Sequence, residues 1–357
     1  MSETPPIYLR LNPADNVVVA RTDIMPGTPV EDVTTTTTVP AGHKIATSAI
    51  KQGEMVRKYD QIIGFASADI QPGDHIHVDN CAMGDFDRDY AIGVDAREVN
   101  FLGDSERATF QGYKRANGSV GTRNYLGILT SVNCSASAAR FIAQSVQTEE
   151  FKERFPNIDG VVALTHSTGC GMAGAGEGYD NLQRVLWGHA RHANFGGVLM
   201  VGLGCEVNQI DFLLEAYGIE RGPHFQTMNI QNAGGTRKTV EWGKKMLEEM
   251  APSVNEATRE TVDASHLSVA LQCGGSDGYS GITANPALGS AVDLLVRHGG
   301  QGILAETPEI YGAEHLLTRR AVSEDVANKL IERIKWWEDY CERNGGEMNN
   351  NPSPGNK

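Results

Sequence analysis

The sequence lacks the marks of membrane and secreted proteins. Its 357 residues contain no apolar run that approaches the roughly 20 residues needed by a membrane-spanning helix. The first residues, MSETPPIYLRLNPADN, lack the basic start and apolar stretch of a secretory signal. The six cysteines are far apart and form no CxxC pair. We therefore expect reduced thiols and a cytoplasmic protein.

Basic residues are in the minority. The 31 Lys and Arg residues oppose 45 Asp and Glu, which gives a formal net charge of −14. Such an acidic surface argues against nucleic acid or an anionic membrane as the main partner. A small anionic substrate remains compatible with it, because a local Arg, Lys or metal ion can outweigh the global field. The length predicts two or three domains.

Residues 7–80 predict a small β domain. One pattern occurs in segments 23–30, 49–56 and 69–76: an apolar residue, a turn containing Gly, then a β-prone residue. Glycine supplies the positive φ that such turns need. Turn chemistry alone leaves open whether the three segments are related or merely have similar turns.

The rest of the chain predicts an α/β domain. Residues 81–111 are acidic and weakly periodic, so we expect a linker or a draped extension. Over residues 112–343 strands alternate with helices, which predicts a mainly parallel sheet. The polar segment 344–357 resembles a disordered tail by composition. We expect strands at 126–132, 160–164, 197–203, 224–230, 267–271 and 302–304, and helices from 135 and at 181–192, 208–217, 239–250, 286–298 and 324–341.

Polar side chains follow each expected strand. Ligands of parallel sheets bind outside the carboxyl ends of the strands, so this placement predicts a polar site on one edge. Simpler interpretations remain open, because a buried Cys is often a small hydrophobe and a loop His is often only hydrogen-bonded. The glycine-rich segment HSTGCGMAGAGEG does not have GxGxxG spacing, which argues against a dinucleotide site. The residues in question are Cys134, His166, Cys170, Cys205, Glu206, Ser276, Asp277 and Glu306.

Basic side chains gather in the β domain and before the first strand of the α/β domain. His75 and His77 face the same side of a strand, which predicts half of a metal site or two exposed histidines. Lys44, beside His43, could neutralise a substrate carboxylate or be a surface lysine. Arg123 offers a planar fork suited to a carboxylate, or to a salt bridge with one of the many acids.

Several ordered motifs together resemble one family, the altronate and galactarate dehydratases. The N-terminal part is similar to the β-clip domain, called SAF, that begins these enzymes. The HxH segment looks like the altronate branch, and the TGCG loop shares features with both branches. The motifs are GHK (42–44), GDHIHVDN (73–80), GSVGTRN (118–124), TSVNC (130–134), THSTGCG (165–171), GLGCE (202–206), CGGSDGYSGITANP (273–286), AETPEIYGAE (305–314) and NPSPGNK (351–357).

The resemblance implies a lyase that dehydrates a sugar acid to a 2-keto-3-deoxy acid with a divalent metal, Fe²⁺ or Mn²⁺. Altronate is the first expectation for the substrate and galactarate the second. Dehydration needs a base for the α-proton, an acid for the departing hydroxyl and a cation for the carboxylate. The implied catalytic residues are His166 and Lys44. Those implied for the metal are His75, His77, His43, Cys205 and Glu206, and those for the substrate Arg123, Asn124, Cys134, Cys170, Ser276, Asp277 and Glu306.

Four expectations concern completeness, oligomeric state and alternative functions. In the family NPSPGNK is internal, so we expect residues 344–357 to begin a missing C-terminal domain. We expect a homo-oligomer, a dimer. A second hypothesis is elimination of sulfite from sulfolactate, because those lyases share the family architecture. A third is a non-catalytic protein that binds sugar acids.

Overall fold

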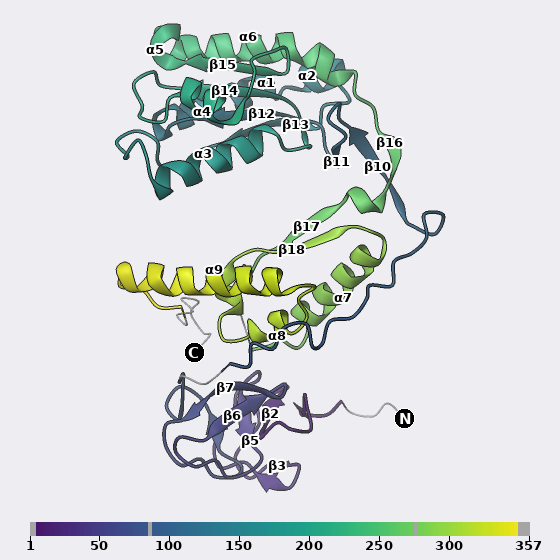
Figure 1. The fold of residues 1–357 in the computed structure, drawn as a ribbon, viewed down its shortest axis with the longest axis vertical. Coiled ribbons are helices and arrows are strands. Elements are labelled where there is room, and N and C mark those ends of the chain that lie inside the picture. The colour runs from purple at the N-terminus through teal and green to yellow at the C-terminus, as the bar shows by residue number, and fades with distance from the viewer. Residues whose placement is uncertain (1–4, 85–87, 275–277, 349–357) are drawn as a thin grey trace. The chain divides into compact units, whose positions relative to one another are not determined.

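The computed structural model describes residues 5–84, 88–274 and 278–348. The chain divides into two compact units (Figure 1). Unit 1 comprises residues 1–101, 268–297 and 301–357, and unit 2 comprises residues 102–267 and 298–300. In the described part of the chain, no helix is both long enough and apolar enough to span a membrane.

The N-terminal part of unit 1 is built from short antiparallel strands. Strands β1, β2, β5 and β8 form one sheet in that order, β6, β7 and β9 form another, and β3 pairs with β4. All four residues of β2 are buried, and Val17 and Val18 belong to two different apolar clusters. The strand therefore packs on both faces. The strands are β1 (Tyr8–Leu9), β2 (Val17–Ala20), β3 (Pro29–Val30), β4 (Val33–Thr34), β5 (Lys44–Ala46), β6 (Met55–Lys58), β7 (Gln61–Ala66), β8 (His75–Ile76) and β9 (Cys81–Ala82).

The three turns predicted from the repeated pattern have one conformation. Their glycines have φ values of 83° at Gly27, 85° at Gly53 and 91° at Gly73. At Gly73 a Cβ atom would lie 2.0 Å from the carbonyl oxygen of Thr34, so a side chain is excluded there. The apolar and β-prone residues before and after each turn are buried: Ile24, Val30, Ile50, Val56, Ile70 and Ile76.

The rest of unit 1 combines a parallel strand pair with helices. Residues 88–101 of the expected linker drape over this region: Gly93 N donates to Thr318 O, and Arg319 forms ion pairs with Asp89 and Asp95. The long C-terminal helix begins at a serine cap, Ser323, whose hydroxyl accepts from Val326 N. The elements of this part of unit 1 are β17 (Ser268–Leu271), β18 (Gln301–Leu304), α7 (Ala284–Arg297), η3 (Thr307–Ile310), α8 (His315–Thr318) and the long C-terminal helix α9 (Glu324–Arg343).

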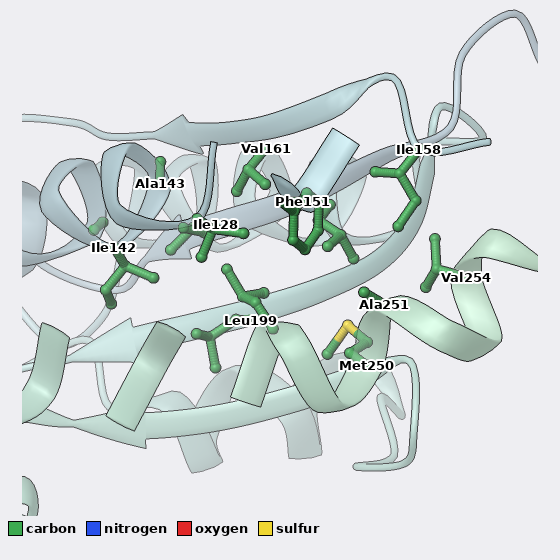
Figure 2. Packing of buried hydrophobic residues seen from close by; sticks show 14 of the residues in the cluster. Ile128, Ile142, Ala143, Phe151, Ile158, Val161, Leu199, Met250, Ala251 and Val254 are labelled. Atoms are coloured by element: carbon green, nitrogen blue, oxygen red, sulfur yellow. The ribbon is translucent and has the colours of Figure 1, made fainter. Parts of the chain in front are cut away.

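Unit 2 contains a four-stranded parallel sheet in the order β13-β12-β14-β15. Helices α1 and α6 pack on one face with an apolar core around Ile128, Ile142 and Leu199 (Figure 2). Helices α3 and α4 pack on the other face. The central strands are buried on both faces, which explains their continuous apolar sequence. The bounds are β12 (Tyr125–Thr130), α1 (Ala136–Val146), β13 (Gly160–Leu164), α3 (Glu177–Ala190), β14 (Phe195–Gly202), α4 (Ile210–Tyr217), β15 (Phe225–Asn229) and α6 (Thr236–Asn255).

The sequence patterns did not indicate the smaller elements of unit 2. Strand β10 pairs with β11 and with β16, and these pairs form a ribbon apart from the parallel sheet. We expected one α/β domain over residues 112–343, but β17 and β18 form a separate sheet and belong to unit 1. The polar strand β16 explains the difference, because it takes the chain out of the parallel sheet to pair with β10. The smaller elements are β10 (Thr109–Lys114), β11 (Val120–Gly121), η1 (Asn133–Ser135), α2 (Glu149–Arg154), α5 (Ile230–Ala233), β16 (Glu260–Asp263) and η2 (Ala264–His266).

Candidate active site

The sheet of unit 2 has a topological switch point between β12 and β14. The chain passes from β12 to β13 on one side and then returns to β14 on the other side. In open parallel sheets, ligands bind at the carboxyl ends of the strands where the strand order reverses in this way. The residues at this point are Ser131 after β12 and Leu203–Glu206 after β14.

Glu206 is held firmly at the switch point. Its side chain is buried, and its Oε1 accepts from Ser131 Oγ at 2.6 Å and from Leu203 N at 3.2 Å. Its Oε2 accepts from Gly204 N at 2.6 Å. The carboxylate thus fixes the loop after β14 to the end of β12. Its expected role as a metal ligand stays a prediction, since the carboxylate already accepts from three donors of the chain.

Three cysteines occupy the same edge. Cys134, Cys170 and Cys205 follow β12, β13 and β14, and all three are exposed. A side-chain hydrogen bond with Cys134 raises the pKa of Cys170, so these two thiols lie together. Asn208 is fully buried behind them and its Nδ2 donates to Ser131 O at 2.9 Å. The strand ends therefore bring Cys134 and Cys170 together, as the sequence led us to expect.

His166 is hydrogen-bonded through both ring nitrogens. Its Nε2 lies 2.8 Å from Thr130 O, and its Nδ1 accepts from Thr168 N at 3.3 Å. Because a carbonyl only accepts, Nε2 is the donor to Thr130 O and Nδ1 is the acceptor. This arrangement matches the simpler interpretation of a hydrogen-bonded loop histidine. A role in acid/base catalysis stays a prediction and would require the ring to leave the Thr168 contact.

Arg123 and Asn124 lie at the opposite end of β12. Both precede the strand, whereas Ser131 follows it, so they do not join the cysteines at the carboxyl edge. Asn124 is fully buried, and its amide bonds Arg115, Asn157 O and Val254 O. The exposed Arg123 donates to Thr122 O. These contacts hold the start of β12 in place, and substrate binding by either residue stays a prediction.

The remaining expected substrate residues belong to the C-terminal part of unit 1. Glu306 follows β18, and its carboxylate accepts from Cys273 N at 2.9 Å and from Gln272 Nε2 at 3.1 Å. It joins the carboxyl ends of the two parallel strands and has a positive φ of 57°. Ser276 and Asp277 lie outside the described residues.

Three histidines of the N-terminal β part form a cluster. Antiparallel pairing of β5 with β8 sets Ile45 opposite His75, and the same register places His43 opposite His77. The ring centroids are 5.0 Å apart for His43 and His75, 5.0 Å for His43 and His77, and 5.4 Å for His75 and His77. Burial, followed by the neighbouring imidazoles, lowers the pKa of both His43 and His75. These rings are therefore kept neutral, which is the form that binds metals.

The three imidazoles are suitable ligands for a divalent metal, but their orientations are not suitable. His43 Nδ1 and His75 Nε2 are 2.8 Å apart, near the roughly 3 Å expected for two imidazoles at right angles on one ion. The rings of His43 and His77, however, are stacked at 8° and do not point at a common centre. Among the residues that the structure describes, no three His, Cys, Asp or Glu side chains are arranged to hold a metal. A metal would need the third ring to turn.

Two pockets accompany these groups. One of about 290 Å³ lies in unit 2 beside Glu206 and includes Asp211, Arg221 and Trp242. The other, of about 340 Å³, lies in unit 1 beside His77 and includes Lys44 and Lys58. No sequence pattern indicated Lys58, which ends an ordinary β strand.

Three family descriptions match successive parts of the chain. The altronate/galactarate dehydratase SAF domain matches residues 6–84, and the D-galactarate dehydratase/altronate hydrolase second domain matches residues 112–255. The D-galactarate/altronate dehydratase C-terminal domain matches residues 264–357. Together with the fold, these matches define a hydro-lyase with an N-terminal SAF domain. The expectation that the C-terminal domain is lacking was wrong, because that domain begins near β17 and not after α9.

Individual relatives agree over almost the whole chain. Altronate dehydratase of Bacillus subtilis is 34% identical over 362 residues, 98% of this chain and 70% of that protein. Altronate dehydratase of Escherichia coli is 36% identical over 361 residues, with 98% and 70% covered. Galactarate dehydratase (L-threo-forming) of Escherichia coli is 35% identical over 366 residues, with 99% and 70% covered. The chain belongs to the altronate/galactarate dehydratase family.

Proposed function

We propose that the chain removes water from altronate, or secondarily from galactarate, to give a 2-keto-3-deoxy acid, and that Fe²⁺ or Mn²⁺ assists. The relatives named above support the reaction and the substrate class. The single observation behind the metal is the cluster of His43, His75 and His77 in the SAF part. A dimer and a cytoplasmic location remain part of this proposal.

The reaction asks the chain to remove an α-proton and release the β-hydroxyl as water. A divalent metal held by the three imidazoles would supply Lewis-acid stabilisation of the negative charge that develops beside the carboxylate. The chain's own part is to favour the neutral forms of His43 and His75, and burial does so by lowering the pKa of both rings. Burial also lowers the pKa of Lys44, which suits a group that exchanges a proton.

A second candidate is the elimination of sulfite from sulfolactate. (2R)-Sulfolactate sulfo-lyase subunit beta of Chromohalobacter salexigens is 31% identical over 230 residues, 62% of this chain and 52% of that protein. Subunit alpha of Paracoccus pantotrophus is 44% identical over 43 residues, 12% of this chain and 64% of that protein. Both eliminations expel a group β to a carboxylate. We rank this candidate second because each match covers less of the chain.

The test compares three substrates with one metal-free preparation. The chain is stripped with a chelator, then supplied anaerobically with Fe²⁺, Mn²⁺ or buffer, and given altronate, galactarate or sulfolactate. We expect a keto acid from altronate in the metal-containing samples and little from the chelated ones. Sulfite from sulfolactate without sugar-acid turnover would favour the second candidate. Sugar-acid binding without turnover under either metal would contradict the dehydratase proposal and favour a binding protein.

A further inference from the structure

Two lysines of the SAF part face one pocket. Lys44 begins β5 and Lys58 ends β6, and both line the cavity of about 340 Å³. The other walls are His77 of the histidine cluster, the apolar side chains Ile63, Ile76 and Val78, and Cys81. Two lysine side chains from separate strands thus border one partly apolar space.

The positive charge in this pocket is poorly compensated. Both lysines are partly buried, and the Lys58 ammonium group lies 5.7 Å from the centre of the Tyr59 ring, which carries no formal charge. Within residues 5–84, 88–274 and 278–348, neither lysine has a carboxylate within the 4.0 Å of an ion pair. The remaining polar side chain of the wall, Cys81, is a free thiol.

The acid that acts on Lys58 is engaged elsewhere. Asp15 favours the charged form of Lys58 only weakly, after the effects of burial and of Lys44. Its carboxylate accepts from Asp60 N at 2.7 Å and from Asn12 N at 3.0 Å. Asp15 therefore stabilises the chain around β6 and leaves the pocket's two positive charges to be met by another anion.

Two partly buried like charges are unfavourable unless an anion lies between them. A carboxylate fits, because its two oxygens can accept one charge-assisted hydrogen bond from each ammonium group. His77 borders the same pocket and stacks on His43. An anion held by the lysines would therefore lie beside the proposed metal ligands.

We propose that Lys44 and Lys58 together bind one carboxylate of the sugar acid, with Lys58 as a substrate-binding residue. This inference rests on the proposed function for the identity of the ligand. The pair would recognise the carboxylate that altronate and galactarate have in common. Loss of the Lys58 ammonium group should then weaken the binding of altronate and of galactarate by similar factors.

The test uses Lys58→Met, which keeps the apolar stem, Lys58→Arg, which restores the charge, and Lys51→Met as control. Lys51 is an exposed lysine of the same part of the chain, paired with Asp69. Calorimetric titration of the metal-free, full-length chain with altronate and galactarate measures binding without turnover. We expect Lys58→Met to raise both Kd values at least about tenfold, since a charge-assisted hydrogen bond is lost. Lys58→Arg should recover most of the affinity, and Lys51→Met should behave as the parent.

Kinetics with metal separate this inference from the proposed function. Lys58→Met should raise KM about as much as Kd, with a smaller change in kcat. Unfolding scans verify the fold, and Lys58→Gln replaces Lys58→Met if the latter does not fold. No binding by the parent chain, or equal Kd values for the parent and the Met or Gln variant, would overturn the lysine site even if the parent dehydrates altronate. Binding that depends on Lys58 without turnover would uphold the site and overturn the dehydratase proposal.

Discussion

The carboxyl edge of the unit 2 sheet and the pocket of the SAF part both contain charged side chains. They differ in whether those side chains have hydrogen-bond or ion-pair partners within the chain. At the edge, Glu206 accepts from three donors, and Arg221 of the adjoining pocket pairs with Asp211. In the SAF pocket, Lys44 and Lys58 face a cavity with no ion pair among the described residues. Groups whose hydrogen bonds are complete mainly hold the fold, whereas buried charges without partners indicate a ligand. Mutations can test whether the residues of the two regions differ in this way.

Glu206→Ala should have the largest effect on stability. The change leaves Ser131 Oγ and two backbone N–H groups without their acceptor, which costs about 3 kcal/mol or more of unfolding free energy. Chemical denaturation measures the loss, and hydrogen exchange in β14 locates it. Glu215→Ala, at an exposed position of α4, is the matched control and should change stability by less than about 0.5 kcal/mol.

The opposite result would break the comparison. If Glu206→Ala kept the stability of the parent but bound less metal, Glu206 would be a ligand, as the sequence alone suggested. Glu206 would then bind a ligand rather than stabilise the fold, and the proposed difference between the sheet edge and the SAF pocket would be wrong for this residue.

His75→Ala should reduce activity more than stability. If His75 helps to hold the metal, kcat/KM for altronate should fall at least about 100-fold, because even residues behind a metal ligand contribute about 10- to 100-fold. The unfolding free energy should change by about 1 kcal/mol at most, since the ring is only partly buried. Metal content by elemental analysis accompanies the kinetics. His266→Ala is the control, because this exposed histidine lies far along the chain in η2. Equal activity of the two variants would remove His75 from the proposed site.

The smallest effect is expected from pH at His192 of unit 2. Burial, then His189, lowers the pKa of His192 below its ordinary value of 6.5, and its Nδ1 accepts from Asn194 N. Protonation is therefore weaker in the folded than in the unfolded chain. The stability contributed by His192 should be present above pH 6.5 and decline as the pH falls below it. Denaturation midpoints from pH 8 to 5 check this, and His192→Gln should flatten that part of the curve. A midpoint that rises on acidification because of His192 would contradict the sign.

Much of the local structure follows from the sequence because its causes are local. Apolar runs that alternate along the chain with helical segments predicted the four strands of the parallel sheet within about two residues of their observed bounds. The turns at Gly27, Gly53 and Gly73 followed from the need for positive φ. On α9 the sequence predicts a helix but not which residues are buried: Val326 is exposed, whereas Ala327 is buried. Its exact rotation depends on what packs against it.

The candidate site was only partly visible in the sequence. Its HxH spacing put His75 and His77 together, and the position after strands brought Cys134 to Cys170. Spacing could not show that the side-chain amide of Asn124 forms hydrogen bonds with other residues of the chain, at the other end of β12. It also gave no weight to Lys58, because a lysine at a strand end is usually a surface residue.

The sequence alone predicted the four strands of the parallel sheet, the longer helices and the glycine turns, and its motifs indicated the family. Tertiary structure decided which distant residues meet. The pairing of β5 with β8 brings His43 to residues 75 and 77, and the packing around β6 brings Lys58 to the pocket of Lys44. Tertiary structure also assigned β17 and β18 to unit 1. The physical reason is that backbone preferences act over a few residues, whereas charge compensation and burial depend on neighbours that only the folded chain brings together.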